Sequence, residues 1–364
     1  DAIHRYELGE YSQWLVDMTG VETPDDSTVV IKFSKPQAFN PGLAIPILPE
    51  HVWAGMSGDE IRKFANDTPV GTGPYMLSVN DPNRRMVLER NPLFRGEPYP
   101  ADGEPGDAAA GLLADAGKPM PFIDRAVYSL ERESIPVWTK FLQGYYDRSA
   151  VGQDSFDQVV NLGAGGELEL TDAMRARGMR LSSSVMSSIF YTGLNMLDDT
   201  VGGDGPKQRA LRQAIAIAID QEESIAIFQN GLGLAMQGPL PPGIFGYRDG
   251  EAGINPYVYG WQAGRPQRLG IERARALLRT AGYPNGRDAA SGKPLVLHSD
   301  SLASGPDAKS YMGWLRKQFG KLGVQLVVRS TDYNRFQDKI RKGDTQMFYY
   351  GWNADYPDPE NFFF

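Results

Sequence analysis

The sequence contains no cysteine, which excludes disulfide bonds, thiolate metal ligands and cysteine nucleophiles. It has no apolar run near the roughly 20 residues that a membrane-spanning helix needs. Its net charge is -8, and it lacks the clustered lysine and arginine that bind phosphate, so no nucleic-acid partner is expected. What remains is the composition of an ordinary globular protein, 41% hydrophobic and 23% charged.

Signatures of enzymes and metal sites are also scarce. The histidines, His4, His51 and His298, lie far apart, and none has a second histidine three or four residues away, so no metal site is predicted. The glycine-rich turn at Gly71 lacks the Gly-Lys-Ser/Thr of a phosphate-binding loop, and no Gly-x-Ser-x-Gly nucleophile motif is present. No cofactor and no catalytic residue are therefore predicted.

The order of the expected elements indicates the fold class. A chain of 364 residues is long for one hydrophobic core, so two or three structural units are expected. Strand-like and helix-like segments alternate, which predicts an α/β fold with helices on the faces of a sheet. We expect strands at 76–79, 85–90, 122–130, 294–299, 324–328 and 346–350, and helices at 136–144, 207–229 with a break at Asp220, 271–282, 307–322 and 332–340.

Two local patterns stand out between these elements. The stretch 96–119 is rich in glycine, alanine, aspartate and proline without periodicity, and is expected to be a surface insertion with little structure. The tetrad DQEE, Asp220 to Glu223, has the spacing of a capping box at the start of a helix, and Gly231 is the expected stop. We interpret these acids as caps.

The loop YYGWNADYPDPEN, Tyr349 to Asn361, combines aromatic rings, carboxylates and two prolines. One interpretation is an acid/base pair of a carbohydrate-active enzyme, formed by Asp355 and Asp358, with an aromatic ring that stacks on a sugar. Another is a single carboxylate between aromatic walls that receives a small cation such as an α-ammonium group. A role of Trp352 and Tyr356 in the core also stays open.

Landmarks along nearly the whole chain resemble one protein family. They are PILPEHVW from Pro46, PVGTGPY from Pro69, LERNP from Leu88, GYYD from Gly144, Leu194-Asn195, RALRQAIAIAID from Arg209, PLPPG from Pro239, ALLRTAGYP from Ala276 and GWNADYPDP from Gly351. In this order they resemble the family 5 extracellular solute-binding proteins, the peptide, nickel and opine receptors of bacterial ABC importers.

The resemblance implies a bilobed α/β receptor of the type II periplasmic-binding-protein kind. Residues 1–193 correspond to part of domain I and residues 194–364 to domain III, without the C-terminal return to domain I, so the sequence is interpreted as an incomplete fragment. Its implied location is periplasmic or otherwise extracytoplasmic, although the first residues show no signal peptide. Its implied partners are a small peptide and the membrane permease, and its implied activity is binding rather than catalysis.

The resemblance also implies a binding site. In peptide-binding members, the aspartate that matches Asp355 pairs with the ligand's α-ammonium group. Trp352 and Asn353 are expected to line the cleft by side chain or backbone, and Asn195 and Met196 to lie at the interlobe crossover. Some oligopeptide receptors carry an arginine for the ligand's carboxylate where this chain has Tyr349. A receptor for a cationic or metal-complexed small molecule is therefore the alternative within binding proteins.

Overall fold

The computed structural model describes residues 17–36, 49–67, 69–131, 133–163, 167–184, 186–302 and 306–363. The chain forms two compact units, Asp1–Arg132 and Glu133–Phe364. Each unit has its own sheets and helices, so each is treated by itself.

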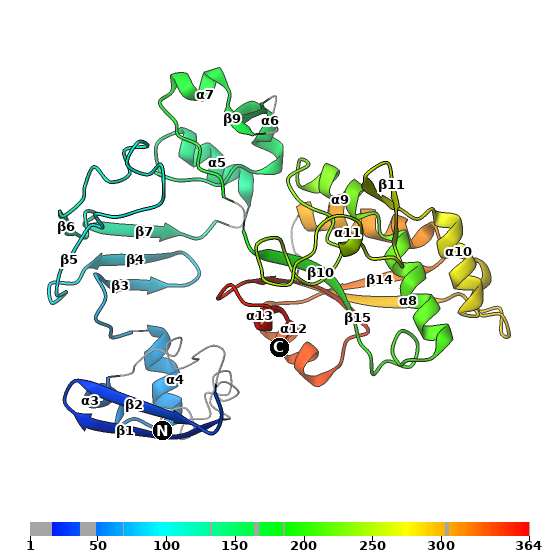
Figure 1. Ribbon diagram of the computed structural model, residues 1–364, viewed down its shortest axis with the longest axis horizontal. Helices are drawn as coiled ribbons and strands as arrows, with labels where there is room; N and C mark the ends of the chain where they lie inside the picture. The colour runs from blue at the N-terminus through cyan, green and yellow to red at the C-terminus, as the bar shows by residue number, and fades with distance from the viewer. Residues whose placement is uncertain are drawn as a thin grey trace. The chain divides into compact units, whose positions relative to one another are not determined.

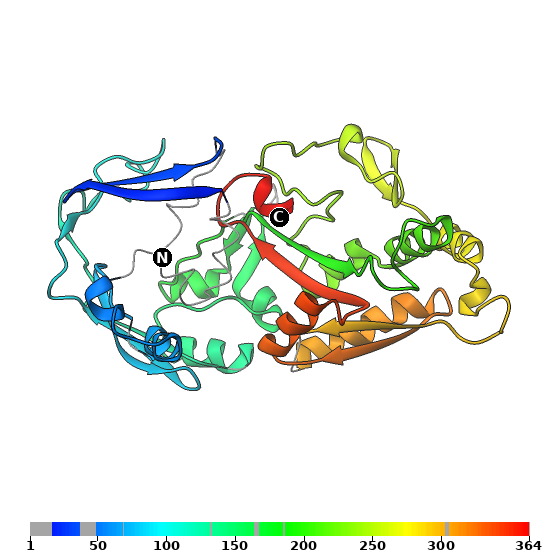
Figure 2. The ribbon, with the colours of Figure 1, turned by 90° about the horizontal axis from the view of Figure 1, so that it is seen from below.

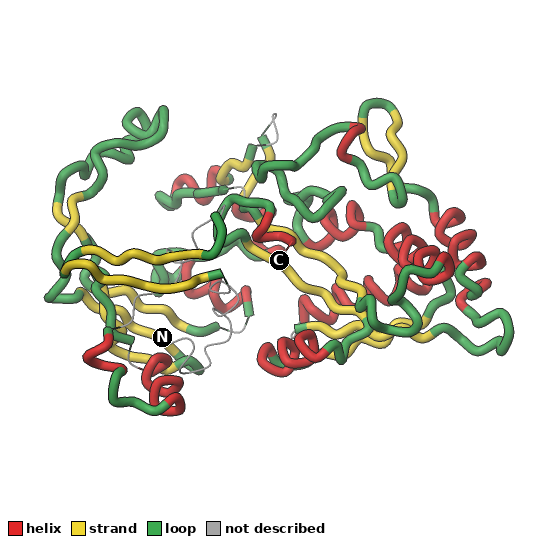
Figure 3. The backbone as a smooth tube through the Cα atoms, turned by 60° about the horizontal axis from the view of Figure 1, so that its bottom comes forward, coloured by secondary structure: helices red, strands yellow, loops and turns green. Residues whose placement is uncertain are grey.

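The first unit is built mainly from antiparallel strands. A three-stranded sheet has the order β3-β4-β7, and its antiparallel strands β3 and β4 confirm the strands predicted at 76–79 and 85–90. The insertion 96–119 consists largely of turns and is tied at its base by a two-residue ladder, as its composition predicted (Figure 3). The elements of this unit are β1 (Met18–Asp25), β2 (Thr28–Phe33), α3 (Glu50–Trp53), α4 (Gly58–Asp67), β3 (Tyr75–Asp81), β4 (Arg85–Arg90), β5 (Glu97–Pro98), β6 (Pro119–Met120) and β7 (Arg125–Ser129).

The second unit opens with a small subdomain around its own apolar cluster. Trp138 of the predicted helix packs there with Phe156, Val159 and Val160, all nearly inaccessible to solvent. The elements are α5 (Ser134–Leu142), η3 (Gln153–Ser155), α6 (Phe156–Val159), β8 (Val160–Leu162), β9 (Leu168–Leu170) and α7 (Asp172–Ala176).

A mixed four-stranded sheet forms the centre of the second unit. Its order is β10-β15-β13-β14, with β10 antiparallel to β15 and β13 parallel to both of its neighbours. Figures 1 and 2 show β10 and β15 side by side along their whole length. The strands are β10 (Ser188–Leu194), β13 (Val296–Ser301), β14 (Gln325–Ser330) and β15 (Met347–Asn353).

Helices cover both faces of this sheet, which confirms the predicted α/β class. On one face, Leu297 and Met347 of the sheet join the main apolar cluster with Leu211 and Phe319 of the helices. On the other face, the ring of Phe336 lies 5.8 Å from that of Tyr350. The helices and remaining elements are α8 (Pro206–Ala218), α9 (Gln221–Phe228), η4 (Glu251–Gly253), β11 (Tyr259–Gln262), β12 (Arg265–Arg268), α10 (Ile271–Thr280), η5 (Pro284–Gly286), α11 (Pro306–Gly320), α12 (Tyr333–Lys342) and α13 (Glu360–Phe363).

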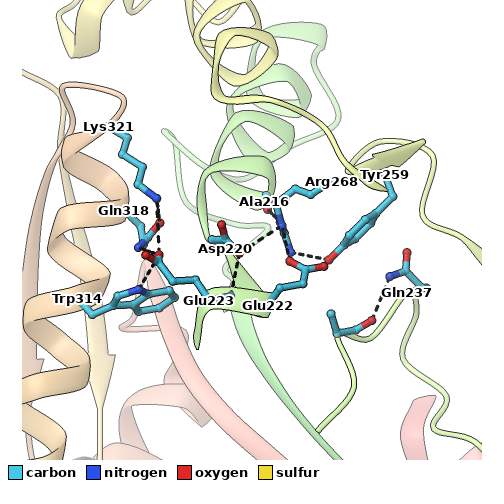
Figure 4. Close-up of polar contacts among 11 residues, drawn as sticks. Ala216, Asp220, Glu222, Glu223, Gln237, Tyr259, Arg268, Trp314, Gln318 and Lys321 are labelled. Atoms are coloured by element: carbon cyan, nitrogen blue, oxygen red, sulfur yellow. Dashed lines mark hydrogen bonds and ion pairs between the residues drawn. The ribbon is translucent and has the colours of Figure 1, made fainter. Parts of the chain in front are cut away.

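The junction of α8 and α9 confirms one half of the predicted capping box. The carboxylate of Asp220 accepts a hydrogen bond from the backbone N–H of Glu223 at 3.0 Å, as an N-cap should. The side chain of Glu223 does not complete the box. It accepts from Trp314 Nε1 at 3.0 Å and from Gln318 Nε2 at 2.7 Å, and thereby joins α9 to α11 (Figure 4).

The neighbouring acid, Glu222, turns to the β11–β12 hairpin instead (Figure 4). Its carboxylate pairs with Arg268 at 2.7 Å, and the guanidinium of Arg268 lies 4.8 Å from the centre of the Tyr259 ring. Burial raises the pKa of Tyr259 well above its ordinary value, so its hydroxyl stays neutral. These contacts hold the hairpin against the start of α9 and assign the acids of the tetrad to the scaffold.

The predicted domain border between 193 and 194 falls at the end of β10, inside the second compact unit. The two compact units meet at 132/133. Compactness and the domain division of a family are different criteria, so the assignment of 1–193 to domain I and 194–364 to domain III stays a prediction.

Candidate functional site

The predicted site residues are arranged by the β10–β15 ladder. Ser188 pairs with Asn353 at one end of this ladder, and Leu194 pairs with Met347 at the other. Side chains of a strand alternate between its faces, so Asn353 shares the face of Tyr349, whereas Trp352 projects from the opposite face. Trp352 and Asn353 therefore cannot line the same wall of a cleft with their side chains.

Asp355 and Trp352 are brought together by a residue of the same loop, Asn361. Its side-chain oxygen accepts from Trp352 Nε1 at 2.9 Å and from the backbone N–H of Asp355 at 2.9 Å. Its amide nitrogen lies 3.4 Å from Asp355 Oδ2. Asn361 is only 7% exposed, whereas the Asp355 side chain is exposed. The loop thus presents Asp355 from a buried support.

The charge around this loop is negative. Burial raises the pKa of Tyr356, and the nearby carboxylates of Glu360, Asp358 and Asp355 raise it further. Among the described residues, no basic side chain forms an ion pair with Asp355. The arrangement can therefore attract a small cation that comes from outside the protein.

Asp358 has a different task from Asp355. Its Oδ1 accepts from the backbone N–H of Glu360 at 2.9 Å at the start of α13, and its carbonyl oxygen accepts from the N–H of Asn361 at 3.2 Å. Asp358 is therefore a turn and cap residue at the start of α13. A carboxylate fixed in this way is poorly placed to act as one member of an acid/base pair with Asp355.

Tyr349 lies within a group of aromatic rings. Its ring is 5.3 Å from that of Tyr311 and is stacked at 6.3 Å on that of Phe190. Tyr311 also contacts Phe228 at 5.4 Å and Trp314 at 5.5 Å. Burial raises the pKa of Tyr349 and that of Tyr311, so this wall carries no charge near neutral pH.

Asn195 and Met196 lie at the far end of the ladder from Asp355. The seven-residue strand β10 separates them from the Ser188–Asn353 end by about 20 Å. The amide nitrogen of Asn195 donates to the carbonyl oxygens of Gly343 at 3.0 Å and Thr345 at 2.8 Å. Its Oδ1 accepts from the N–H of Leu197 at 3.0 Å, so the side chain is engaged with backbone groups.

The two described histidines lie in different units. His298 lies in β13 with its Nδ1 3.0 Å from Nη2 of Arg329, and His51 lies in α3 of the other unit. His4 falls outside the described residues. In the described part of the chain, no three histidine, aspartate or glutamate side chains come together as ligands of a metal ion would.

Some residues of the site were missed in the sequence. Asn361 belongs to the quoted loop but had no predicted role, because its contacts depend on the turn that brings it back to Trp352. Strand β10 was not predicted, although SIFYTGL is rich in the β-branched and aromatic residues that favour strands. With that strand, Ser188 and Phe190 also escaped notice.

The comparison with protein families shows the family of the chain. The family model described as bacterial extracellular solute-binding proteins, family 5 Middle, matches residues 4–364. The chain belongs to this family. The resemblance seen in the sequence is thereby confirmed, and the family 5 proteins are binding proteins rather than enzymes. No helix among the described residues has the length and apolar character needed to cross a membrane.

Individual relatives of this family 5 chain differ in what their names say they bind. A dipeptide-binding protein of Escherichia coli strain K12 is 23% identical over 358 residues, which are 94% of this chain and 54% of the relative. Heme-binding protein A of Haemophilus influenzae is 29% identical over 152 residues, 42% of this chain and 25% of the relative. The chain thus spans about half, or less, of the length of these relatives.

Solved structures share the fold of the family 5 chain. DppA of Helicobacter pylori, a periplasmic binding protein in complex with the peptide STSA, has a TM-score of 0.68 at 19% identity and is matched over 99% of this chain and 58% of its own. AppA of Bacillus subtilis, in complex with a nonapeptide, has a TM-score of 0.69 at 15% identity over 100% of this chain and 68% of its own. These likenesses confirm the predicted periplasmic-binding-protein fold class.

Proposed function

We propose that this family 5 chain is the substrate-binding component of an ABC importer, that it binds small peptides outside the cytoplasm, and that it delivers them to a membrane permease. The chain performs no chemistry on the ligand. The ligand favours the delivery-competent conformation only if it binds that conformation more tightly than it binds the conformation of the empty receptor. The family assignment and the named relatives support the class, and the loop around Asp355 supports the kind of ligand.

The observation that carries this proposal is the exposed carboxylate of Asp355, which Asn361 supports and which forms no ion pair among the described residues. An exposed carboxylate without a basic partner among the described residues is available to the ammonium group of a peptide's N-terminus. Asn361 fixes its backbone, so little ordering remains to be done when the ligand binds. Trp352 is 37% exposed beside it and offers an aromatic face.

The other predicted residues contribute less directly. Tyr349 gives the site an uncharged aromatic wall in place of a cation for the ligand's carboxylate. Asn353, whose Oδ1 accepts from Ser188 Oγ at 2.7 Å, lies at the end of the same face. Asn195 and Met196 lie at the other end of the ladder, and we propose a scaffold role for Asn195 rather than contact with the ammonium group.

The test is selection of peptides from a mixed library of two to five residues, read by mass spectrometry of what the protein retains. We expect the parent to retain peptides with a free N-terminus and to lose the same peptides after N-acetylation. Asp355→Asn should weaken retention by about 2 to 5 kcal/mol, because it removes the charge of the ion pair. Asp358→Asn is the matched control, and its retention should equal that of the parent.

If the parent retained free and N-acetylated peptides equally, Asp355 would not be the anchor of the ammonium group. The same would follow if Asp355→Asn and Asp358→Asn weakened peptide retention equally. Turnover of aryl glycosides that disappears in Asp355→Asn would instead favour the carbohydrate-active enzyme.

The relative named as a heme-binding protein favours one second candidate, a receptor for a metal-complexed small molecule. Native mass spectrometry of the purified protein separates the two. A spread of bound masses that match peptides supports the peptide receptor, whereas one fixed bound mass that carries a metal isotope pattern supports the second candidate.

A further inference from the structure

The second unit contains a cavity that neither Asp355 nor its loop lines. Its volume is about 470 Å³. The lining includes no charged side chain: eight residues are apolar and four are neutral and polar. They are Val151, Phe156, Val160, Leu168, Leu181, Ser182, Ser183, Phe190, Phe228, Gln229, Asn230 and Leu232. The cavity therefore offers a charged group no partner of opposite charge.

Phe190 is the most unusual member of this lining. It lies in the middle of β10, yet its side chain is 61% exposed. Its ring lies over Gly351, the residue opposite it in β15, and a Cβ at that position would overlap the ring. The absence of a side chain at Gly351 thus makes room for the ring of Phe190. This ring stays largely exposed to water, although burial of apolar surface is favourable.

The opposite rim of the cavity is held by the end of α9. Phe228, the last residue of that helix, packs edge-on against Tyr311 and Trp314. The chain then turns through Asn230, whose φ of 51° lies in the left-handed region that few residues other than glycine adopt. This turn places Asn230 and Leu232 along the cavity.

We propose that this cavity, which we call the Phe190 pocket, is a subsite for a large, uncharged apolar side chain of the same ligand whose ammonium group pairs with Asp355. The proposal rests on the proposed function and narrows its substrate class to peptides that contain residues such as leucine or phenylalanine. Gly351, under the ring of Phe190, precedes Asp355 by four residues. The Cα atoms of these two residues therefore lie at most about 14 Å apart. A short peptide spans that distance.

The experiment uses the same equimolar peptide library and scores side-chain class. We expect the parent to enrich peptides with leucine, phenylalanine or tyrosine over counterparts with aspartate or lysine by about tenfold or more, the range expected for burying one such side chain. Phe190→Ala should reduce this enrichment about threefold or more, while alanine peptides are retained as by the parent. Phe245→Ala, which removes a phenylalanine that is 86% exposed outside the pocket, should change nothing.

A glycine pair provides a second test that removes no ring. Gly351→Ala should displace Phe190 and lower the enrichment, because the new Cβ overlaps its ring. Gly193→Ala introduces the same crowding against Phe348 on the other face of the sheet, so it should leave the enrichment unchanged.

The outcomes separate the subsite from the proposed function. If peptides are retained but Phe190→Ala keeps the parent's enrichment, or if the two glycine variants behave alike, the subsite is wrong while the receptor stands. If the parent retains no peptide of any composition, the peptide receptor is wrong and the subsite is wrong with it.

Discussion

Trp352 donates its indole N–H to the side-chain oxygen of Asn361 at 2.9 Å, and the same oxygen accepts the backbone N–H of Asp355 at 2.9 Å. One buried acceptor therefore fixes both the indole ring of Trp352 and the backbone of Asp355. This relationship makes Asn361 the support of the proposed anchor.

Asn361→Leu removes that acceptor with little change in size. It leaves two donors without a partner, so we expect the free energy of unfolding to fall by about 1 to 3 kcal/mol, measured by urea denaturation. Asn334→Leu, the same change at an exposed asparagine of α12, is the matched control and should change the free energy of unfolding by much less. Equal stability of Asn361→Leu and the parent would show that the two hydrogen bonds do not stabilise the loop.

A buried ion pair under α12 supports a second prediction. Asp300 of β13 is 1% exposed and pairs with Lys339 of α12, and its second oxygen has no hydrogen-bond partner among the described residues. Lys339→Met should cost about 3 to 5 kcal/mol, because it leaves a buried carboxylate without its cation. The additional change Asp300→Asn should recover part of this loss, and chemical denaturation of the three proteins measures both effects.

The same helix offers the control for this prediction. Lys342 forms an exposed pair with Asp338 at 2.8 Å, and Lys342→Met should cost at most about 1 kcal/mol. If Lys342→Met and Lys339→Met lowered the free energy of unfolding by similar amounts, the burial of Asp300 would not increase the cost of losing its cation.

The third prediction concerns pH. Burial alone would raise the pKa of Glu222, but the hydrogen bond and charge of Arg268 outweigh it, and the folded-state pKa lies below its ordinary value of 4.5. The ionised carboxylate therefore contributes stability above pH 4.5, and this contribution is lost as the pH falls through the folded-state pKa.

Glu222→Gln should lower the free energy of unfolding near neutral pH by less than about 1 kcal/mol, since the carboxylate is half exposed. Below the folded-state pKa the two proteins should converge. Urea denaturation between acidic and neutral pH measures both curves, and parallel curves over the whole range would contradict the prediction.

Several elements were predictable from the sequence because their signals are local. Asp220 caps its helix as predicted, and Asp332 caps the helix predicted at 332–340; the carboxylate of each accepts a hydrogen bond from the N–H three residues later. The buried face of α8, with Leu211 and Ile215, follows from helical spacing. The landmarks in order indicated the family, which the family model confirms.

The site was less predictable. The side chains of adjacent strand residues point to opposite faces. The opposite orientations of Trp352 and Asn353 could therefore have been predicted if the sequence had shown that β15 extends to Asn353. The separation of Asn195 from Asp355 required the antiparallel partner β10, which pairs residues more than 150 positions apart. Glu223 looked like half of a capping box, but its partners come from α11, nearly a hundred residues later.

The sequence by itself determined the fold family, the helix caps and the aromatic, acidic character of the loop at the end of β15, because composition, spacing and local hydrogen bonds specify these features. Only the tertiary structure decided which carboxylate is exposed on a buried support, which rings form the uncharged wall, and that Phe190 stands unburied over Gly351. Those features depend on contacts between segments far apart in the chain, whose pairing follows from packing of the whole unit rather than from any local pattern.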